Sequence, residues 1–279
     1  MTHEEERVWL IEKLKAENPG YRKIPVPKPE DAQKDMLRIL MNVRMPAPLS
    51  AEFVEIQNAY LRKEAMLKGI IDEKMLKPCS TDPRLYIWQG DITRLKVDAI
   101  TNAANGGMTG CYTPLHNCID NAIHSAAGLE LRQECARIME RQGYEEPAGQ
   151  AKITSGYCLP AKHVIHTVGP IVHGELNDVH RDLLRSCYRS CLELAEKNRL
   201  RSIAFCCIST GVFMFPADKA AGIAVRTVKE YLDEQDGRYG EIGSYIGKNT
   251  DDGYRGIEKV IFNVFSDRDL HIYERILEK

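Results

Sequence analysis

Three side chains that bind soft metal ions lie close together in the middle of the chain. Cys111, His116 and Cys118 form the pattern C-x4-H-x-C. Two thiolates and an imidazole suit Zn²⁺, and three protein ligands leave a position open, as in catalytic rather than structural zinc sites. Two buried cysteines beside an unrelated histidine remain an alternative. The neighbours of these residues are polar or turn-forming, which weakens that alternative: Thr113, Pro114 and Asn117.

Two loops that could hold an anion precede predicted helices. The first contains Gly106, Gly107 and Gly110, which allow a close approach of the backbone to a ligand, and the helix after it would point free amides at the same space. It has neither a Walker lysine nor a G-x-G-x-x-G pattern, so a nucleoside triphosphatase or a Rossmann oxidoreductase is not supported. The second loop is residues 209–213, "STGVF". When each loop is considered alone, an ordinary turn explains it as well as an anion site does.

Four further side chains have a functional and a structural interpretation. Asp120 either orients a water or sugar hydroxyl, or caps its helix. His124 lies one turn later on the same face, where helix packing is the simpler explanation. Asp91 would accept a hydrogen bond from an adenine amino group or form an Asx turn. Phe265 would stack on a base or complete the core.

Strands alternate with helices from about residue 84 onward, which predicts an α/β sheet covered by helices on both faces. The strands are apolar without polar alternation, a pattern that favours parallel pairing. We expect one helix over residues 121–141 and a mobile loop over residues 236–256. In such sheets ligands bind at the carboxyl ends of strands, where the two loops above would face each other. Cys206 and Cys207 lie within an apolar strand and are assigned to the core, and His166 is assigned a structural role.

The first 80 residues differ from the rest. Val8, Ile11 and Leu14 form a helical stripe, four prolines follow, and Ser50 is placed to cap a long amphipathic helix. We interpret residues 1–80 as an extension of about three helices and residues 84–279 as the main domain. The pattern alone predicts a packing appendage without chemistry of its own.

Composition limits the classes of partner. The chain has 279 residues, 43% of them hydrophobic, and a formal net charge of -2. This balance gives no bulk attraction to nucleic acid or to an anionic membrane, so no partner of either kind is expected. The sequence has no signal-peptide pattern and no apolar run near the roughly 18 residues that span a bilayer. Nine cysteines without an export signal predict reduced thiols and a cytoplasmic location.

Taken together, these segments resemble the macrodomain family, and within it the MacroD-type ADP-ribosyl hydrolases. The resemblance is carried in order by "GDIT", "VDAITNAAN", "AIHSAAG", "AKITSGYCLPAKHVIHTVGP", "RSIAFCCISTGVFMFP" and "VIFNVFSDRDLHIY". It covers residues from about 84 to 277. It implies an α/β fold in which a mixed sheet is sandwiched between helices, so that all-parallel pairing need not hold. It also implies ADP-ribose as the ligand.

The resemblance assigns roles to individual residues. Asp91, with Ile92, matches the acceptor of the adenine amino group, and Phe265 matches the aromatic residue beside the adenine. Asn105 matches the residue that contacts the distal ribose, and Asp120 matches the aspartate beside the scissile bond. The loop that wraps the diphosphate and distal ribose corresponds to Ser209, Thr210, Gly211, Val212 and Phe213.

The loop between Asn105 and Asp120 departs from the MacroD pattern. It is longer than the usual glycine-rich loop, and the insertion delivers Cys111 and His116, with Cys118 directly after. This resembles a zinc-containing subgroup that also has an N-terminal helical extension. It implies a Zn²⁺-dependent hydrolase that removes mono-ADP-ribose from modified protein side chains. The metal would either activate a water or orient and polarise the distal ribose, and we favour the second role because two thiolate ligands donate strongly. A non-catalytic reader of ADP-ribose with a structural zinc is the alternative.

Overall fold

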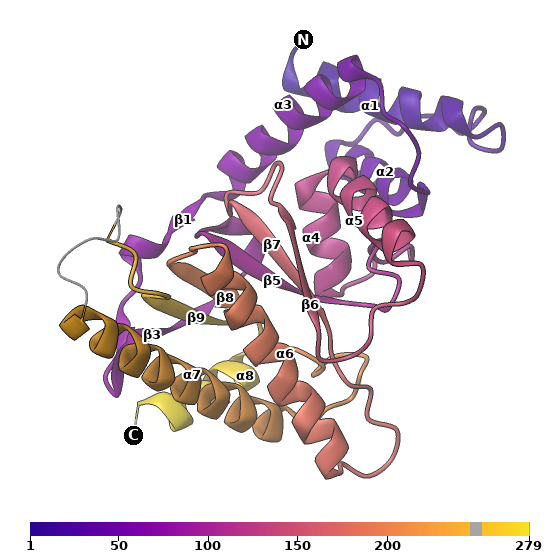
Figure 1. Cartoon of the computed structure of the whole chain (residues 1–279). Coiled ribbons are helices and arrows are strands. Elements are labelled where there is room, and N and C mark those ends of the chain that lie inside the picture. Colours follow the sequence, from indigo (N-terminus) through magenta and orange to yellow (C-terminus); the bar gives the residue numbers. More distant parts are fainter. Residues whose placement is uncertain (246–252, 279) are drawn as a thin grey trace.

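A mixed seven-stranded sheet forms the centre of the molecule (Figure 1), in a computed structural model that describes residues 1–245 and 253–278. The strand order is β2-β3-β9-β8-β5-β7-β6. The five inner strands are parallel, whereas β2 and β6 pair antiparallel at the two edges. The mixed sheet predicted from the family resemblance is therefore confirmed. The strands are β2 (Pro78–Cys79), β3 (Asp82–Gln89), β5 (Ala99–Ala104), β6 (Ala151–Ser155), β7 (His163–Val168), β8 (Ser202–Phe205) and β9 (Lys259–Val264).

Helices cover both faces of the sheet, as predicted. α4 and α5 lie on one face, and α6, α7 and α8 lie on the other (Figure 1). Tyr188 of α6 packs its ring 4.9 Å from that of Phe205 in β8, and both side chains are fully buried in the main apolar core. These helices are α4 (Ile119–Ala127), α5 (Leu129–Gln142), α6 (Asp178–Lys197), α7 (Ala217–Tyr245) and α8 (Asp267–Leu277).

The single helix predicted over residues 121–141 is wrong, because the chain breaks at Gly128 into α4 and α5. Gly128 has φ +93°, and a Cβ on it would lie 2.6 Å from Nε2 of Gln57. The Gln57 Oε1 in turn accepts a hydrogen bond from the amide of Leu129 at 2.9 Å. The break is therefore the point at which an earlier helix docks, a long-range contact that local helix propensity does not encode.

The mobile loop predicted over residues 236–256 is wrong for its first part, because α7 continues to Tyr245. Glu196 on α6 accepts hydrogen bonds from Arg238 and from the Tyr239 hydroxyl, so tertiary contacts hold this polar stretch against the neighbouring helix. Residues 253–256 lie outside regular secondary structure. The remainder of the predicted loop, residues 246–252, lies outside the described residues.

Three helices form the N-terminal part of the chain, each with an identifiable start signal or apolar face. Thr2 and Glu5 form a capping box at the first helix, and Ser50 caps the third by accepting from the amide of Phe53 at 3.1 Å. The helices are α1 (His3–Glu17), α2 (Glu30–Val43) and α3 (Ala51–Lys68). They enclose their own apolar cluster of buried residues, which Leu129 of α5 joins: Leu10, Ile11, Leu14, Leu37, Leu40, Met41, Phe53 and Tyr60.

Short elements connect this extension to the sheet. β1 (Ile71–Asp72) pairs in parallel with β4 (Leu95–Lys96), and a 3-10 turn, η1 (Glu73–Met75), leads into β2. Among the described residues, no helix has both the length and the apolar character needed to cross a membrane.

The burial of a side chain in the extension predicts how much its shortening lowers the free energy of unfolding. Ile11 is completely buried, and Ile11→Ala is expected to lower the free energy of unfolding by about 2–5 kcal/mol, because it removes apolar contacts and leaves a cavity. Ile24→Ala makes the same chemical change at a side chain that is 46% exposed, and should change it by less than about 0.5 kcal/mol. Urea denaturation of both variants tests this, and equal losses would contradict it.

Candidate active site and metal centre

Four groups of predicted site residues follow four adjacent parallel strands. The strands lie in the order β3, β9, β8, β5, so their carboxyl ends present Asp91, Phe265, the loop 209–213 and Asn105 in that order along one edge of the sheet. Three strand spacings separate the first from the last, a span of about 14 Å. The structure therefore brings together residues that are up to 174 positions apart in sequence, as in a ligand crevice of an open α/β sheet.

At one end of this row stand Asp91 and Phe265. One carboxylate oxygen of Asp91 caps the 3-10 turn η2 (Ile92–Arg94), accepting from the Thr93 amide at 3.0 Å and the Thr93 hydroxyl at 2.7 Å. Its other oxygen lies 4.0 Å from Nζ of Lys68. Phe265 is 79% exposed, so the alternative that it completes the core is wrong. An exposed aromatic ring at this edge of the sheet is available for stacking.

The loop between β8 and α7 offers backbone amides. Among the described residues, the amides of Gly211, Val212 and Phe213 donate to no other protein group. Consecutive free amides in a loop form a concave anion site. Ser209 has φ +65° and is buried, yet its Oγ has no hydrogen-bond partner within the described chain. Val212 is exposed and Phe213 partly so, whereas Ile92 at the far end of the row is buried.

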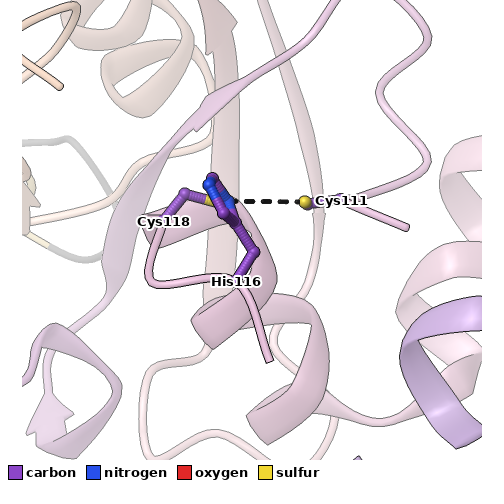
Figure 2. Close-up of side chains that lie close together, drawn as sticks. All are labelled: Cys111, His116 and Cys118. Carbon is purple, nitrogen blue, oxygen red and sulfur yellow. Dashed lines mark hydrogen bonds between the residues drawn. The ribbon is translucent and has the colours of Figure 1, made fainter. Parts of the chain in front are cut away.

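The three predicted metal ligands converge. The donor atoms of Cys111, His116 and Cys118 all lie within 4.8 Å of one another, and Figure 2 shows the Cys111 sulfur facing the His116 ring. The Cys111 Sγ lies 3.7 Å from His116 Nδ1. Tetrahedral zinc with ordinary bond lengths places sulfur and nitrogen ligands about 3.6 Å apart, so the donor set and its spacing fit Zn²⁺.

Cys118 has a second role in the backbone. Its Sγ accepts a hydrogen bond from the Asn121 amide at 3.4 Å and so caps the N-terminus of α4. Burial raises the pKa of the Cys118 thiol to about 11, with the nearby Cys111 adding to the effect. Without a positive partner this sulfur stays protonated at neutral pH, whereas a thiolate ligand requires a cation beside it.

Residues 109–118 carry the three possible metal ligands and are called the metal loop below. Gly110 fixes the start of this loop. Its φ is +88°, and a Cβ on it would lie 2.8 Å from Cγ of His124, so only glycine fits both conditions. Its carbonyl accepts a hydrogen bond from Asn105 Nδ2 at 3.2 Å. The metal loop is thereby attached directly to the end of β5.

Asp120 is held between two asparagines. Asn102 Nδ2 donates to one carboxylate oxygen at 2.8 Å, and Asn105 Nδ2 donates to the other at 3.3 Å. Burial raises the pKa of Asp120 to about 6, although the Asn102 hydrogen bond and the charge of Arg132 lower it in part. The alternative that Asp120 caps its helix is wrong, because Cys118 occupies that position.

Asn102 and His166 form a support that sequence reasoning missed. Asn102 Nδ2 also contacts His166 Nδ1 at 3.1 Å, and His166 Nε2 lies 2.9 Å from the Thr154 hydroxyl. An amide NH₂ can only donate, so His166 accepts at Nδ1 and carries its proton on Nε2. The predicted structural role of His166 thus consists of orienting Asn102 beneath Asp120. The available signal was a polar asparagine in the middle of an apolar strand.

His124 lies beside this network without joining it. Its Nε2 is 3.5 Å from Asp120 Oδ1, but burial holds the pKa of His124 well below its ordinary value, so the two do not form an ion pair. With Cys135 and His166 it forms a second close group of possible ligands, all buried. Because both ring nitrogens of His166 already have hydrogen-bond partners, neither is free to bind a metal, and we assign no metal to this group.

The sheet defines an α/β protein in which a loop with free amides and a loop with three possible metal ligands follow the neighbouring strands β8 and β5. Among solved structures, the Trypanosoma brucei macrodomain in complex with ADP-ribose aligns with a TM-score of 0.61 at 32% identity, covering 83% of this chain and 92% of that one. The Oceanobacillus iheyensis macrodomain with ADP aligns with a TM-score of 0.57 at 37% identity, covering 72% and 93%. The family pattern described as Macro domain matches residues 101–224.

Two relatives align over nearly the whole chain. A protein-ADP-ribose hydrolase of Treponema medium is 50% identical over 279 residues, which cover 99% of this chain and 100% of the relative. A protein-ADP-ribose hydrolase of Staphylococcus aureus strain MRSA252 is 43% identical over 272 residues, covering 97% and 94%. The chain belongs to the macrodomain family.

The buried His166 makes stability depend on pH. Burial lowers the pKa of His166 from its ordinary 6.5 to about 3, so below pH 6.5 the unfolded state binds a proton that the folded state excludes. Stability is therefore lost as pH falls through this window. The variant His166→Gln, which lacks this proton, is less stable than wild type at pH 7, but the difference should shrink by about 2 kcal/mol at pH 5. Urea titrations at both values check this, and an unchanged difference would contradict it.

Proposed function

We propose that this macrodomain is a hydrolase that removes mono-ADP-ribose from modified protein side chains and depends on Zn²⁺ held by Cys111, His116 and Cys118. Its products would be free ADP-ribose and the restored side chain, with one water consumed. We further propose that it acts in the cytoplasm, since its nine cysteines are all free thiols. Its partners are ADP-ribose and the modified protein.

The activity is supported by relatives and by geometry. Two relatives named protein-ADP-ribose hydrolase share 50% and 43% identity with this chain over nearly its full length. The observation that carries the proposal is the order of groups along the sheet edge: an exposed aromatic, free amides, then Asn105 and Asp120 beside three metal-type ligands. That order matches adenine, diphosphate and distal ribose in ADP-ribose.

The chain's own groups bind and orient the substrate in this arrangement. The Phe265 ring stacks on the adenine, and the Asp91 oxygen that does not cap η2 accepts from its amino group. The amides of the 209–213 loop hold the diphosphate. Contacts far from the scissile bond thus hold the distal ribose in a reactive position, which lowers the entropic cost of the reaction.

Asn105 and Asp120 act at the reacting end. The Asn105 amide, fixed by Asp120 and by the Gly110 carbonyl, positions a ribose hydroxyl. Asp120 is largely ionised at neutral pH and accepts a hydrogen bond from a water or sugar hydroxyl beside the scissile bond. When bound, Zn²⁺ would supply a Lewis acid that polarises an oxygen of the substrate. The two cysteines and one histidine leave room for such an oxygen.

Removing one sulfur tests the dependence on zinc. Cys118→Ser keeps an oxygen that caps α4 but loses a soft ligand, so we expect loss of bound zinc and of most turnover in a folded protein. Elemental analysis and release of ADP-ribose from a mono-ADP-ribosylated protein, with and without a chelator, measure this. Full turnover by metal-free Cys118→Ser would rule out the zinc requirement.

A matched variant separates metal loss from catalysis. Asp120→Ala should retain zinc while losing about 10²- to 10⁴-fold in turnover, because a positioned proton acceptor is removed. If wild type binds ADP-ribose and zinc but releases nothing from the modified protein, the chain is a reader with a structural zinc instead.

The exposed ring at the other end predicts a binding effect. Phe265→Ala should weaken ADP-ribose binding about 5- to 100-fold, the range expected for one lost stacking contact, and leave stability unchanged because the ring is 79% exposed. Val179→Ala, a second exposed apolar side chain, is the control. Calorimetric titration measures both, and wild-type affinity in Phe265→Ala would place the adenine elsewhere.

A further inference from the structure

Arg38 of α2 connects the N-terminal extension to the loop that carries the metal ligands. Its Nε and Nη2 donate to Asn121 Oδ1 at 3.1 and 2.7 Å, and Nη2 also donates to the carbonyl of His116 at 3.3 Å. Asn121 is completely buried, and its Nδ2 donates in turn to the Thr113 carbonyl at 3.0 Å. One side chain of the extension thus fixes the backbone of His116 directly and that of Thr113 indirectly.

Asn42, one turn further along α2, holds the residue before His116. Its Oδ1 accepts a hydrogen bond from the amide of Leu115 at 3.1 Å, and its Nδ2 donates to the hydroxyl of Ser125 on α4 at 2.9 Å. Leu115 has φ +53°, a left-handed conformation that costs a branched residue about 1–3 kcal/mol unless the surroundings hold it. The buried Asn42 supplies that restraint from outside the loop.

Arg132 of α5 completes the connection at the start of the loop. It is buried, and its Nη1 donates to three carbonyls at the end of α2, those of Met41, Asn42 and Arg44, at 2.6–2.9 Å. Its Nε donates to the Thr109 carbonyl at 2.8 Å, two residues before the first ligand. The end of α2 and the beginning of the metal loop therefore share one buried cation.

We propose that α2 is a positioning element that holds the Cys111, His116 and Cys118 ligands in place for metal binding. This inference rests on the proposed zinc-dependent function and gives the extension a role in it. Neither Arg38 nor Asn42 is placed to bind the metal, so each acts only through the loop backbone. A ligand set held in advance loses less conformational entropy when the ion binds, which raises affinity.

The test compares two variants on the same helix. Arg38→Gln removes the contacts to the metal loop, and Lys34→Gln removes contacts to Glu30 and Glu64, which both belong to the extension. Competition with a chromogenic chelator gives the zinc affinity, and the d–d absorption of substituted Co²⁺ reports the ligand geometry. We expect about 10- to 100-fold weaker zinc binding and an altered Co²⁺ spectrum in Arg38→Gln. Lys34→Gln should match wild type, and saturating zinc should restore turnover in Arg38→Gln.

Each outcome separates the two proposals. If wild type takes up no zinc, the zinc-dependent function fails, and the positioning role fails with it. If wild type binds zinc and Arg38→Gln binds it equally well, the positioning role is overturned while the zinc site stands. Equal losses in Arg38→Gln and Lys34→Gln would attribute the effect to a loosened extension and overturn it as well. Should Arg38→Gln fail to fold by circular dichroism, Asn42→Ser, which keeps an oxygen but shortens its reach to Leu115, decides by the same measurements.

Discussion

Parallel pairing of β3, β9, β8 and β5 is the constraint on which the row of candidate site residues depends. Parallel strands end at the same edge, so one sheet aligns an exposed aromatic, a row of free amides and a buried carboxylate without any one loop having to span them. The spacing between strands sets the spacing between subsites. This row of groups suits a ligand that is long, polar in the middle and aromatic at one end.

A buried polar network beneath this edge of the sheet holds the side chains of the reacting end in one arrangement. Asn102 lies in the centre of the sheet, and its one NH₂ group donates to both Asp120 and His166. Because His166 must then donate to Thr154, the donor and the acceptor of each hydrogen bond in this network are fixed. Asp120 is thereby held in one orientation although no full charge of opposite sign contacts it.

Much of this arrangement could be predicted from sequence, because local patterns carry it. The strand–helix alternation, the glycine-rich loop and the spacing of Cys111, His116 and Cys118 are short-range signals. The break at Gly128 and the role of Asn102 were missed, since each depends on a partner more than 60 residues away: Gln57 for the first and His166 for the second. The length of α7 was missed because contacts to Glu196 of α6, 42 and 43 residues away, override its polar, glycine-containing sequence.

Backbone strain explains why the site needs support from outside its own loops. Six described non-glycine residues have positive φ, and four of them lie in the segments that follow β5 and β8: Met108, Leu115, Ser209 and Met214. Such conformations cost about 1–3 kcal/mol each, and they persist only where other contacts hold them. The 209–213 loop is held by the Val172 amide, which donates to the Phe213 carbonyl, whereas the metal loop is held by α2. A helix that precedes the sheet in the sequence therefore supplies the hydrogen bond that holds Leu115 in its left-handed conformation.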